Sequence, residues 1–229
     1  MKSGALLLVA FLSLPAFFQS ILAKATQSEL PAETPADDPA PTKLSLRDAL
    51  APLATLVASG ESTDAGGYDA ANNGYGMDLG NNGLVRVLGA PHYKLTIGDV
   101  IHAQQSGRIH AAGRYQIIGR TMRKAVGWAG LSYSDTFCAS NQDRLFLALI
   151  REKRPAVWNY LTGYGSAAAA ADAMAREWAS ISYWDGLGYY SGGRAHVSRP
   201  AILSALEQAK TAVALANSGP YLVTPSTGS

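Results

Sequence analysis

The sequence contains a single cysteine, Cys138, among its 229 residues. One thiol cannot form an intramolecular disulfide, so packing and hydrogen bonds have to hold the fold. No set of cysteine and histidine residues has the spacing of a zinc site, and we expect neither a metal nor a cofactor. Cys138 stands between Phe137 and Ala139, which favours a small buried side chain over a catalytic thiol.

Charge of either sign is also scarce. Charged residues make up 16% of the chain and the formal net charge is +2. Nothing resembles the basic stripe of a nucleic-acid-binding protein, so we expect no nucleic-acid partner. A hydrophobic fraction of 48% is typical of a globular protein.

Long hydrophobic runs are absent except at the N-terminus, where an apolar stretch extends from Ala5 to Phe18. This stretch is shorter than the roughly 20 residues of a transmembrane helix. Lys2 precedes it, and Ala23-Lys24-Ala25 follows as a small-x-small cleavage site. Residues 1–25 are therefore predicted to be a signal peptide of a periplasmic or secreted protein that keeps no stable membrane insertion after cleavage. A retained signal anchor is the alternative.

Composition divides the rest of the chain. Residues 26–43 are rich in proline and acidic residues, which predicts a flexible linker. Residues 44–217 carry the apolar patterns of one folded domain, and residues 218–229 are predicted to be a disordered tail. No internal repeat is present.

The domain begins with a helical pattern and continues with a stretch rich in glycine and asparagine. Leu46, Leu50, Leu53 and Val57 recur at helical spacing, so we expect a helix that ends near Gly60. From 64 to 93, turn residues around Asn82-Gly83 precede Leu84, Val85 and Val87, which predicts a short strand within a small β-hairpin lobe.

Helices are expected over most of the remaining domain. Thr96-x-x-Asp99 has the form of a capping box that opens a helix through about Gln105, and Ser140-x-x-Asp143 is a second such signal. Three further helices are predicted over residues 117–126, 167–180 and 200–215. The expected fold class is α+β and mostly helical, with a helical lobe, a small β-hairpin lobe and a cleft between them.

Glu61 is the first candidate catalytic residue. It directly follows the predicted first helix, where the negative end of the helix dipole disfavours a carboxylate. The same field, with partial burial, raises the pKa of a carboxyl group and keeps it protonated, as a general acid for glycosidic cleavage requires.

Two other segments carry residues suited to binding a sugar. In Ala112-Gly113-Arg114-Tyr115-Gln116, the glycine permits a close backbone approach, Tyr115 offers a ring for stacking, and Gln116 offers both a donor and an acceptor. The other segment, Gly186 to Gly193, places Tyr189 and Tyr190 among glycines. Each segment taken alone is also compatible with an ordinary turn.

Taken together, these motifs resemble the lysozyme-like superfamily. Glu61-Ser62, Gly113-x-Tyr115-Gln116 and Tyr189-Tyr190-x-Gly192 are similar to the ordered motifs of phage-lambda-type endolysins and secreted bacterial muramidases, or lytic transglycosylases. Gln142-Asp143 and Trp178-Ala179-Ser180-Ile181 extend the likeness, which covers about Leu50 to Ala209.

The resemblance implies an enzyme that cleaves the bond between N-acetylmuramic acid and N-acetylglucosamine in peptidoglycan. Glu61 would be the general acid. In lytic transglycosylation the 6-hydroxyl of muramic acid attacks C1 of the same sugar, and one carboxylate suffices. Hydrolysis needs a second carboxylate. Asp69 is our first candidate for it, ahead of Asp64 and Asp78. The residues expected to bind the glycan strand are Ser62, Arg114, Tyr115, Gln116, Tyr189 and Tyr190.

Two hypotheses from other classes remain open. The domain could be a non-catalytic module that binds peptidoglycan glycan strands. It could also be a component of an envelope-spanning secretion machine. The presence of Glu61 beside an intact Gly113-Arg114-Tyr115-Gln116 segment favours the enzyme.

Overall fold

The computed structural model describes residues 44–74, 79–183, 186–190 and 195–218. The predicted signal peptide, the Pro-rich linker and residues 219–229 of the predicted tail lie outside these described residues. So does Asp78, one of the candidates for a second carboxylate.

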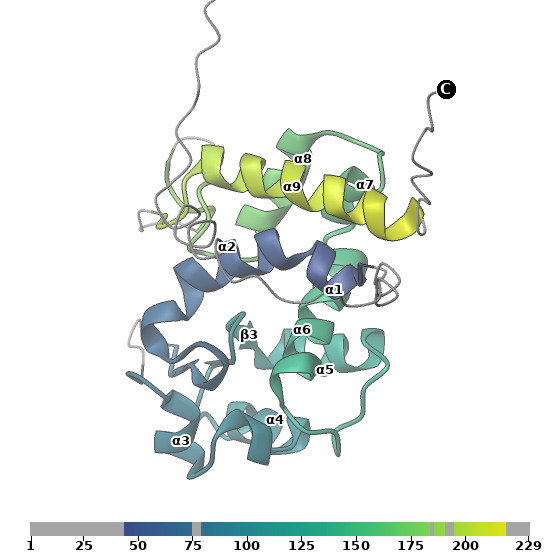
Figure 1. Cartoon of the computed structure of the whole chain (residues 1–229). Helices are drawn as coiled ribbons and strands as arrows, with labels where there is room; N and C mark the ends of the chain where they lie inside the picture. Colours follow the sequence, from purple (N-terminus) through teal and green to yellow (C-terminus); the bar gives the residue numbers. More distant parts are fainter. Residues whose placement is uncertain (1–43, 75–78, 184–185, 191–194, 219–229) are drawn as a thin grey trace, which may run out of the picture. The chain divides into compact units, whose positions relative to one another are not determined.

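The described chain is mostly helical (Figure 1). The α-helices are α1 (Leu46–Ala49), α2 (Ala51–Glu61), α3 (Gly83–Leu88), α4 (Ile97–Gln105), α5 (Gly119–Trp128), α6 (Ala139–Ala148), α7 (Pro155–Leu161), α8 (Ala167–Ala175) and α9 (Arg199–Ser218). Short 3₁₀ turns are η2 (Thr63–Ala65), η3 (Gly67–Asp69) and η4 (His92–Lys94), and η5 (Leu149–Lys153) is a π-helical turn that continues α6.

A small antiparallel sheet accompanies the helices. Its strands are β1 (Ala71–Asn72), β2 (Ala111–Ala112) and β3 (Ile117–Ile118), in the order β1-β2-β3. Ala71 pairs with Ala112, and Ala112 pairs with Ile117, so β2 and β3 form a hairpin whose turn is residues 113–116. The predicted α+β fold, mostly helical with a small β lobe, is confirmed.

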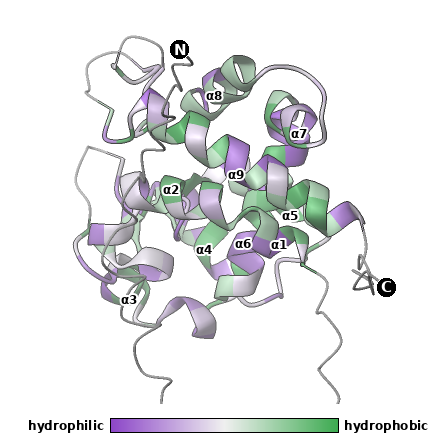
Figure 2. Ribbon diagram, turned by 45° about the horizontal axis from the view of Figure 1, so that its top comes forward, coloured by the Kyte–Doolittle hydropathy of each residue, from purple (hydrophilic) through white to green (hydrophobic). Residues whose placement is uncertain are grey.

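Helix α2 lies in the middle of this domain. In Figure 1, α7, α8 and α9 lie on one side of it, and the sheet, α3 and α4 lie on the other. Its residues Leu53 and Val57 are fully buried, and α2 and α1 both pack against α9. Hydrophobic and hydrophilic residues alternate along α9 (Figure 2), which fits a helix with one face on the core. The C-terminal end of α2 therefore emerges between the two groups of elements.

The predicted strand at Leu84 to Val87 is wrong, because these residues form α3. Leu84 is fully buried while Val85 is 37% exposed, and Gly83 lies so close to β1 that a Cβ there would be 2.9 Å from the Ala71 nitrogen. Short apolar runs do not distinguish helix from strand, and packing on β1 selected the helix here. The sheet is built from other residues.

Helix boundaries were predicted with mixed success. The Thr96 capping box is confirmed, with both of its reciprocal hydrogen bonds to Asp99 present. Ser140 does not cap α6, since Cys138 is the N-cap residue and makes no side-chain cap. The alanine-rich helix ends at Ala175 and not at Ser180, and Ile181 and Ser182 further along form backbone bridges to Val197 and Gly188.

Gln142 joins the sheet region to α6. Its side chain is 1% exposed. Its Oε1 accepts a hydrogen bond from the Arg114 nitrogen at 2.9 Å, and its Nε2 donates to the carbonyls of Tyr68 (3.1 Å) and Phe137 (2.9 Å). One buried amide thus satisfies backbone groups from three separate segments.

We expect Gln142→Leu to lower the free energy of unfolding by about 2–4 kcal/mol, because it leaves buried backbone groups without this partner. Gln208→Leu on the exposed face of α9 is the matched control and should change stability by less than about 0.5 kcal/mol. Urea denaturation followed by circular dichroism measures both. Equal stability of the two variants would refute the linking role of Gln142.

Candidate active site

The carboxyl group of Glu61 is held at the C-terminal end of α2. Its Oε1 accepts two hydrogen bonds from Ser180, one from the backbone nitrogen at 3.2 Å and one from Oγ at 2.6 Å. Ser180 is 6% exposed, and Glu61 itself is half-buried. Two donors on one oxygen fix the orientation of the carboxyl group.

The segment that carries Ser180 is itself fixed by backbone hydrogen bonds. The Val197 nitrogen donates to the Ser180 carbonyl at 2.9 Å, and the Ser182 nitrogen donates to the Val197 carbonyl at 2.9 Å. Gly60 makes the approach of α2 possible, since a Cβ at that position would lie 2.5 Å from Ser180 Oγ. Glu61 is therefore positioned by close packing as well as by hydrogen bonds.

Ser62 holds the helix end to the β2–β3 turn. Its hydroxyl donates to the Arg114 carbonyl at 2.7 Å, and its side chain is buried at 3% exposure. The predicted contact of Ser62 with the glycan is wrong, because the hydroxyl is used inside the protein.

Tyr115 is also buried, at 1% exposure. Its ring stacks on Phe146 with 4.4 Å between centroids, and its hydroxyl donates to Asp143 at 2.7 Å. Burial, together with this hydrogen bond, raises the pKa of the Tyr115 hydroxyl. The prediction that Tyr115 stacks on a sugar is wrong, since its ring is a core side chain.

Arg114 and Gln116 line two different pockets. Arg114 Nη1 donates to the Tyr68 hydroxyl at 2.7 Å, and the Tyr68 hydroxyl donates to Asp143 at 2.9 Å. Asp143 also pairs with Arg47 of α1 at 2.7 Å. The pocket of about 210 Å³ beside these groups is at the N-terminal end of α2, about 15 Å along the helix from Glu61.

Gln116 adopts a left-handed backbone conformation with φ of 45°. Its Nε2 donates to the Gly113 carbonyl at 2.8 Å, and its Oε1 accepts from Asn72 Nδ2 at 2.8 Å. Such a conformation costs a non-glycine residue about 1 kcal/mol or more and is often found at functional sites. The two side-chain hydrogen bonds help to hold Gln116 in it.

A small pocket of about 70 Å³ brings Gln116 and Tyr190 together. Trp178 forms part of its wall and donates its indole N–H to the Tyr115 carbonyl at 3.0 Å. Trp178 is two residues before Ser180, so the wall of this pocket and the segment that holds Glu61 are one continuous stretch of chain. Two of the predicted binding residues, Gln116 and Tyr190, thus line one pocket.

The tyrosines at 183, 189 and 190 form an exposed aromatic cluster. Tyr189 contacts the rings of both Tyr183 and Tyr190 edge-on, at 5.3 Å between centroids in each case. Tyr189 is 46% exposed and Tyr190 is 56% exposed, so their rings are accessible. Unlike Tyr115, these two residues have the surface position that stacking on a sugar requires.

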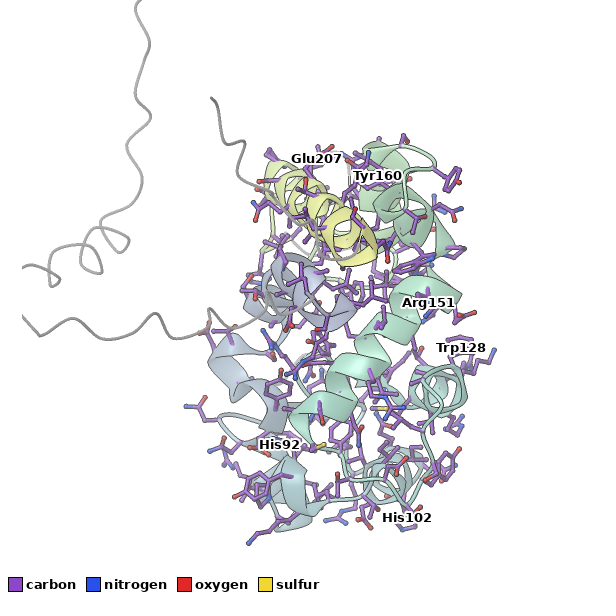
Figure 3. All side chains as sticks on the ribbon, turned by 45° about the vertical axis from the view of Figure 1, so that its right-hand side comes forward. His92, His102, Trp128, Arg151, Tyr160 and Glu207 are labelled. Atoms are coloured by element: carbon purple, nitrogen blue, oxygen red, sulfur yellow. The ribbon has the colours of Figure 1, made fainter. Side chains whose placement is uncertain are left out.

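The carboxylates proposed as partners of Glu61 lie in the turns after α2. Asp69 Oδ1 accepts from the His92 nitrogen at 2.6 Å and lies 3.0 Å from His92 Nδ1. Asp69 therefore joins η3 to η4, the turn that carries His92 (Figure 3). Asp64 is exposed in η2.

No group of three His, Cys, Asp or Glu side chains among the described residues is arranged to hold a metal ion. No helix within the described ranges is long and apolar enough to cross a membrane.

Sequence reasoning missed the role of Ser180. The residue lies in the Trp178-Ala179-Ser180-Ile181 stretch that resembles the superfamily, but its partner Glu61 is 119 positions away. No local pattern reveals a contact of that separation.

Comparison with protein-family models decides the family. The model described as Endolysin matches residues 51–210, which are 160 of the 229 residues. The chain belongs to the endolysin family. No curated protein and no solved structure matches it significantly. As an endolysin, the chain is an enzyme that lyses peptidoglycan.

We expect Gly60→Ala to reduce lytic activity and to lower the free energy of unfolding by about 1–3 kcal/mol, because the new methyl group forces α2 away from Ser180. Gly127→Ala in α5 is the control. A Cβ there meets nothing within 4 Å, so that variant should be as active as the parent and up to about 1 kcal/mol more stable. Turbidity loss of sacculi and thermal melts provide the measurements. Full activity of Gly60→Ala would show that the contact with Ser180 does not position the acid.

Proposed function

We propose that this endolysin cleaves the β-1,4 bond between N-acetylmuramic acid and N-acetylglucosamine, with Glu61 as the general acid and base. The observation that carries the proposal is the double hydrogen bond from Ser180 to Glu61 Oε1. Ser180 follows by two residues Trp178, which lines a pocket together with Gln116 and Tyr190. As the general acid, Glu61 carries the transferable proton on its carboxyl group.

The reaction begins with transfer of this proton to the glycosidic oxygen. The bond from C1 of muramic acid to that oxygen then breaks, and positive charge develops at C1. The 6-hydroxyl of the same muramic acid attacks C1, and Glu61, now a carboxylate, accepts the hydroxyl proton. The products are a free N-acetylglucosamine 4-hydroxyl and a 1,6-anhydro end.

This one-carboxylate route, lytic transglycosylation, is favoured over hydrolysis by the contacts of Asp69. Its Oδ1 is used to hold His92, which assigns it a structural task within the η3–η4 turns. Hydrolysis with Asp69 as the second carboxylate is the competing route.

The predicted signal peptide further supports action in the periplasm or outside the cell.

The first test replaces the acid. Glu61→Gln keeps the shape of the side chain but cannot supply the proton, so release of glycan fragments from purified sacculi should fall by about 100- to 10,000-fold. Chromatography of the soluble fragments measures the loss, and an unchanged circular dichroism spectrum shows that the fold persists. Activity within tenfold of the parent would remove Glu61 from the mechanism.

The second test separates the two routes. Mass spectrometry of the fragments should find products lighter by one water molecule than reducing-end products, as an anhydro end requires. Asp69→Asn retains an acceptor for the His92 nitrogen and should keep activity within about tenfold of the parent. Reducing ends as the main product, together with loss of activity in Asp69→Asn, would establish hydrolysis and a catalytic Asp69.

A further inference from the structure

A second pocket adjoins the one that contains Gln116 and Tyr190. It has a volume of about 320 Å³ and lies between the start of α7 and α8. The two pockets share Lys153 and Arg176 in their walls. Arg176, the first residue after α8, therefore stands between the glycan-binding pocket and the second pocket.

Most of the charges around the second pocket are paired. Glu177, only 7% exposed, binds Lys153 through Oε1 and Arg154 through Oε2, each at 2.7 Å. Asp172 pairs with Arg199 at 2.8 Å. Within the part of the chain that the structure describes, Arg176 is the cation of this pocket for which no carboxylate lies at ion-pair distance.

The guanidinium of Arg176 is exposed but held in place. It lies over the rings of Tyr189 and Tyr183, 5.3 and 5.9 Å from their centroids, and its Nη2 donates to the Tyr183 hydroxyl at 3.3 Å. The Tyr190 hydroxyl donates to the Arg176 carbonyl at 2.9 Å. Because aromatic rings support the side chain, less rotamer freedom is lost when it binds an anion.

We propose that Arg176 and the second pocket form a subsite for a carboxylate of the peptide stem on muramic acid. The inference rests on the proposed function, which puts the glycan strand beside Tyr190. In a strand that bears stems the sugars are neutral, because the lactyl carboxyl group of muramic acid is in amide linkage to the stem, whereas the stems carry free carboxylates. A planar guanidinium can bind a carboxylate through two parallel hydrogen bonds. The subsite makes the enzyme prefer glycan that bears stems.

The test compares two soluble substrates, uncrosslinked glycan strands that bear stems and the same strands after an amidase has removed the stems and the lactyl carboxylates that it frees have been converted to methylamides. We expect the enzyme to have a KM about tenfold lower for the stem-bearing strands at similar kcat. Arg176→Gln should abolish most of this preference, by raising KM about five- to tenfold on stem-bearing strands and less than twofold on stripped ones. Arg176→Lys should retain part of the preference.

Arg151→Gln is the matched control. This variant also removes a charge that lies over an aromatic ring, since the guanidinium of Arg151 is 5.1 Å from the centroid of Trp158. Arg151 faces a different surface, beside Trp128 (Figure 3). This variant should keep the preference. An unchanged preference in Arg176→Gln would overturn the proposal. An equal rise of KM on both substrates would also overturn it, since Arg176 would then only support the tyrosines.

A binding measurement distinguishes failure of this proposal from failure of the proposed chemistry. Calorimetry with the Glu61→Gln protein needs no turnover, and it should show the same preference for stem-bearing strands. Adding Arg176→Gln to that protein should remove it. If the parent enzyme releases no fragments but Arg176→Gln removes the calorimetric preference, the proposed chemistry is wrong and the proposed subsite is supported. Equal affinity for both strands would refute the subsite.

Discussion

The contact between Glu61 and Ser180 is the constraint on which the site depends. It joins the end of α2 to a segment 119 residues later and is permitted by the absence of a side chain at Gly60. Ser180 in turn is held by Val197, which precedes α9. The acid is thus oriented by two elements that also form the core, so its position depends on how the domain packs.

In the turn from Gly113 to Gln116, some groups make contacts in the protein interior and Gln116 lines a pocket. Tyr115 and the Arg114 carbonyl are used internally, by Asp143 and Ser62, while Gln116 faces the small pocket. The strained backbone at Gln116 is consistent with this division, because a left-handed residue there redirects the chain between two buried neighbours. A segment rich in polar groups therefore contributes more to stability than to binding.

Charge pairing determines which charged groups the two adjoining pockets can offer to a substrate. The π-helical turn η5 ends at Lys153, and both Lys153 and the following Arg154 bind the buried side chain of Glu177. A buried carboxylate needs such partners, since desolvation without them is costly. This arrangement leaves Arg176 exposed over its tyrosines, where it adds a positive charge to a mostly aromatic surface.

The sequence by itself determined the mostly helical α+β class, the capping box at Thr96 and the position of Glu61 at the end of the first long helix, because these depend on local periodicity and on residues close along the chain. Tertiary structure decided the rest. It turned Leu84 to Val87 into a helix, buried Tyr115 and gave Glu61 its partner Ser180, because burial and contacts between distant segments depend on how the whole chain packs.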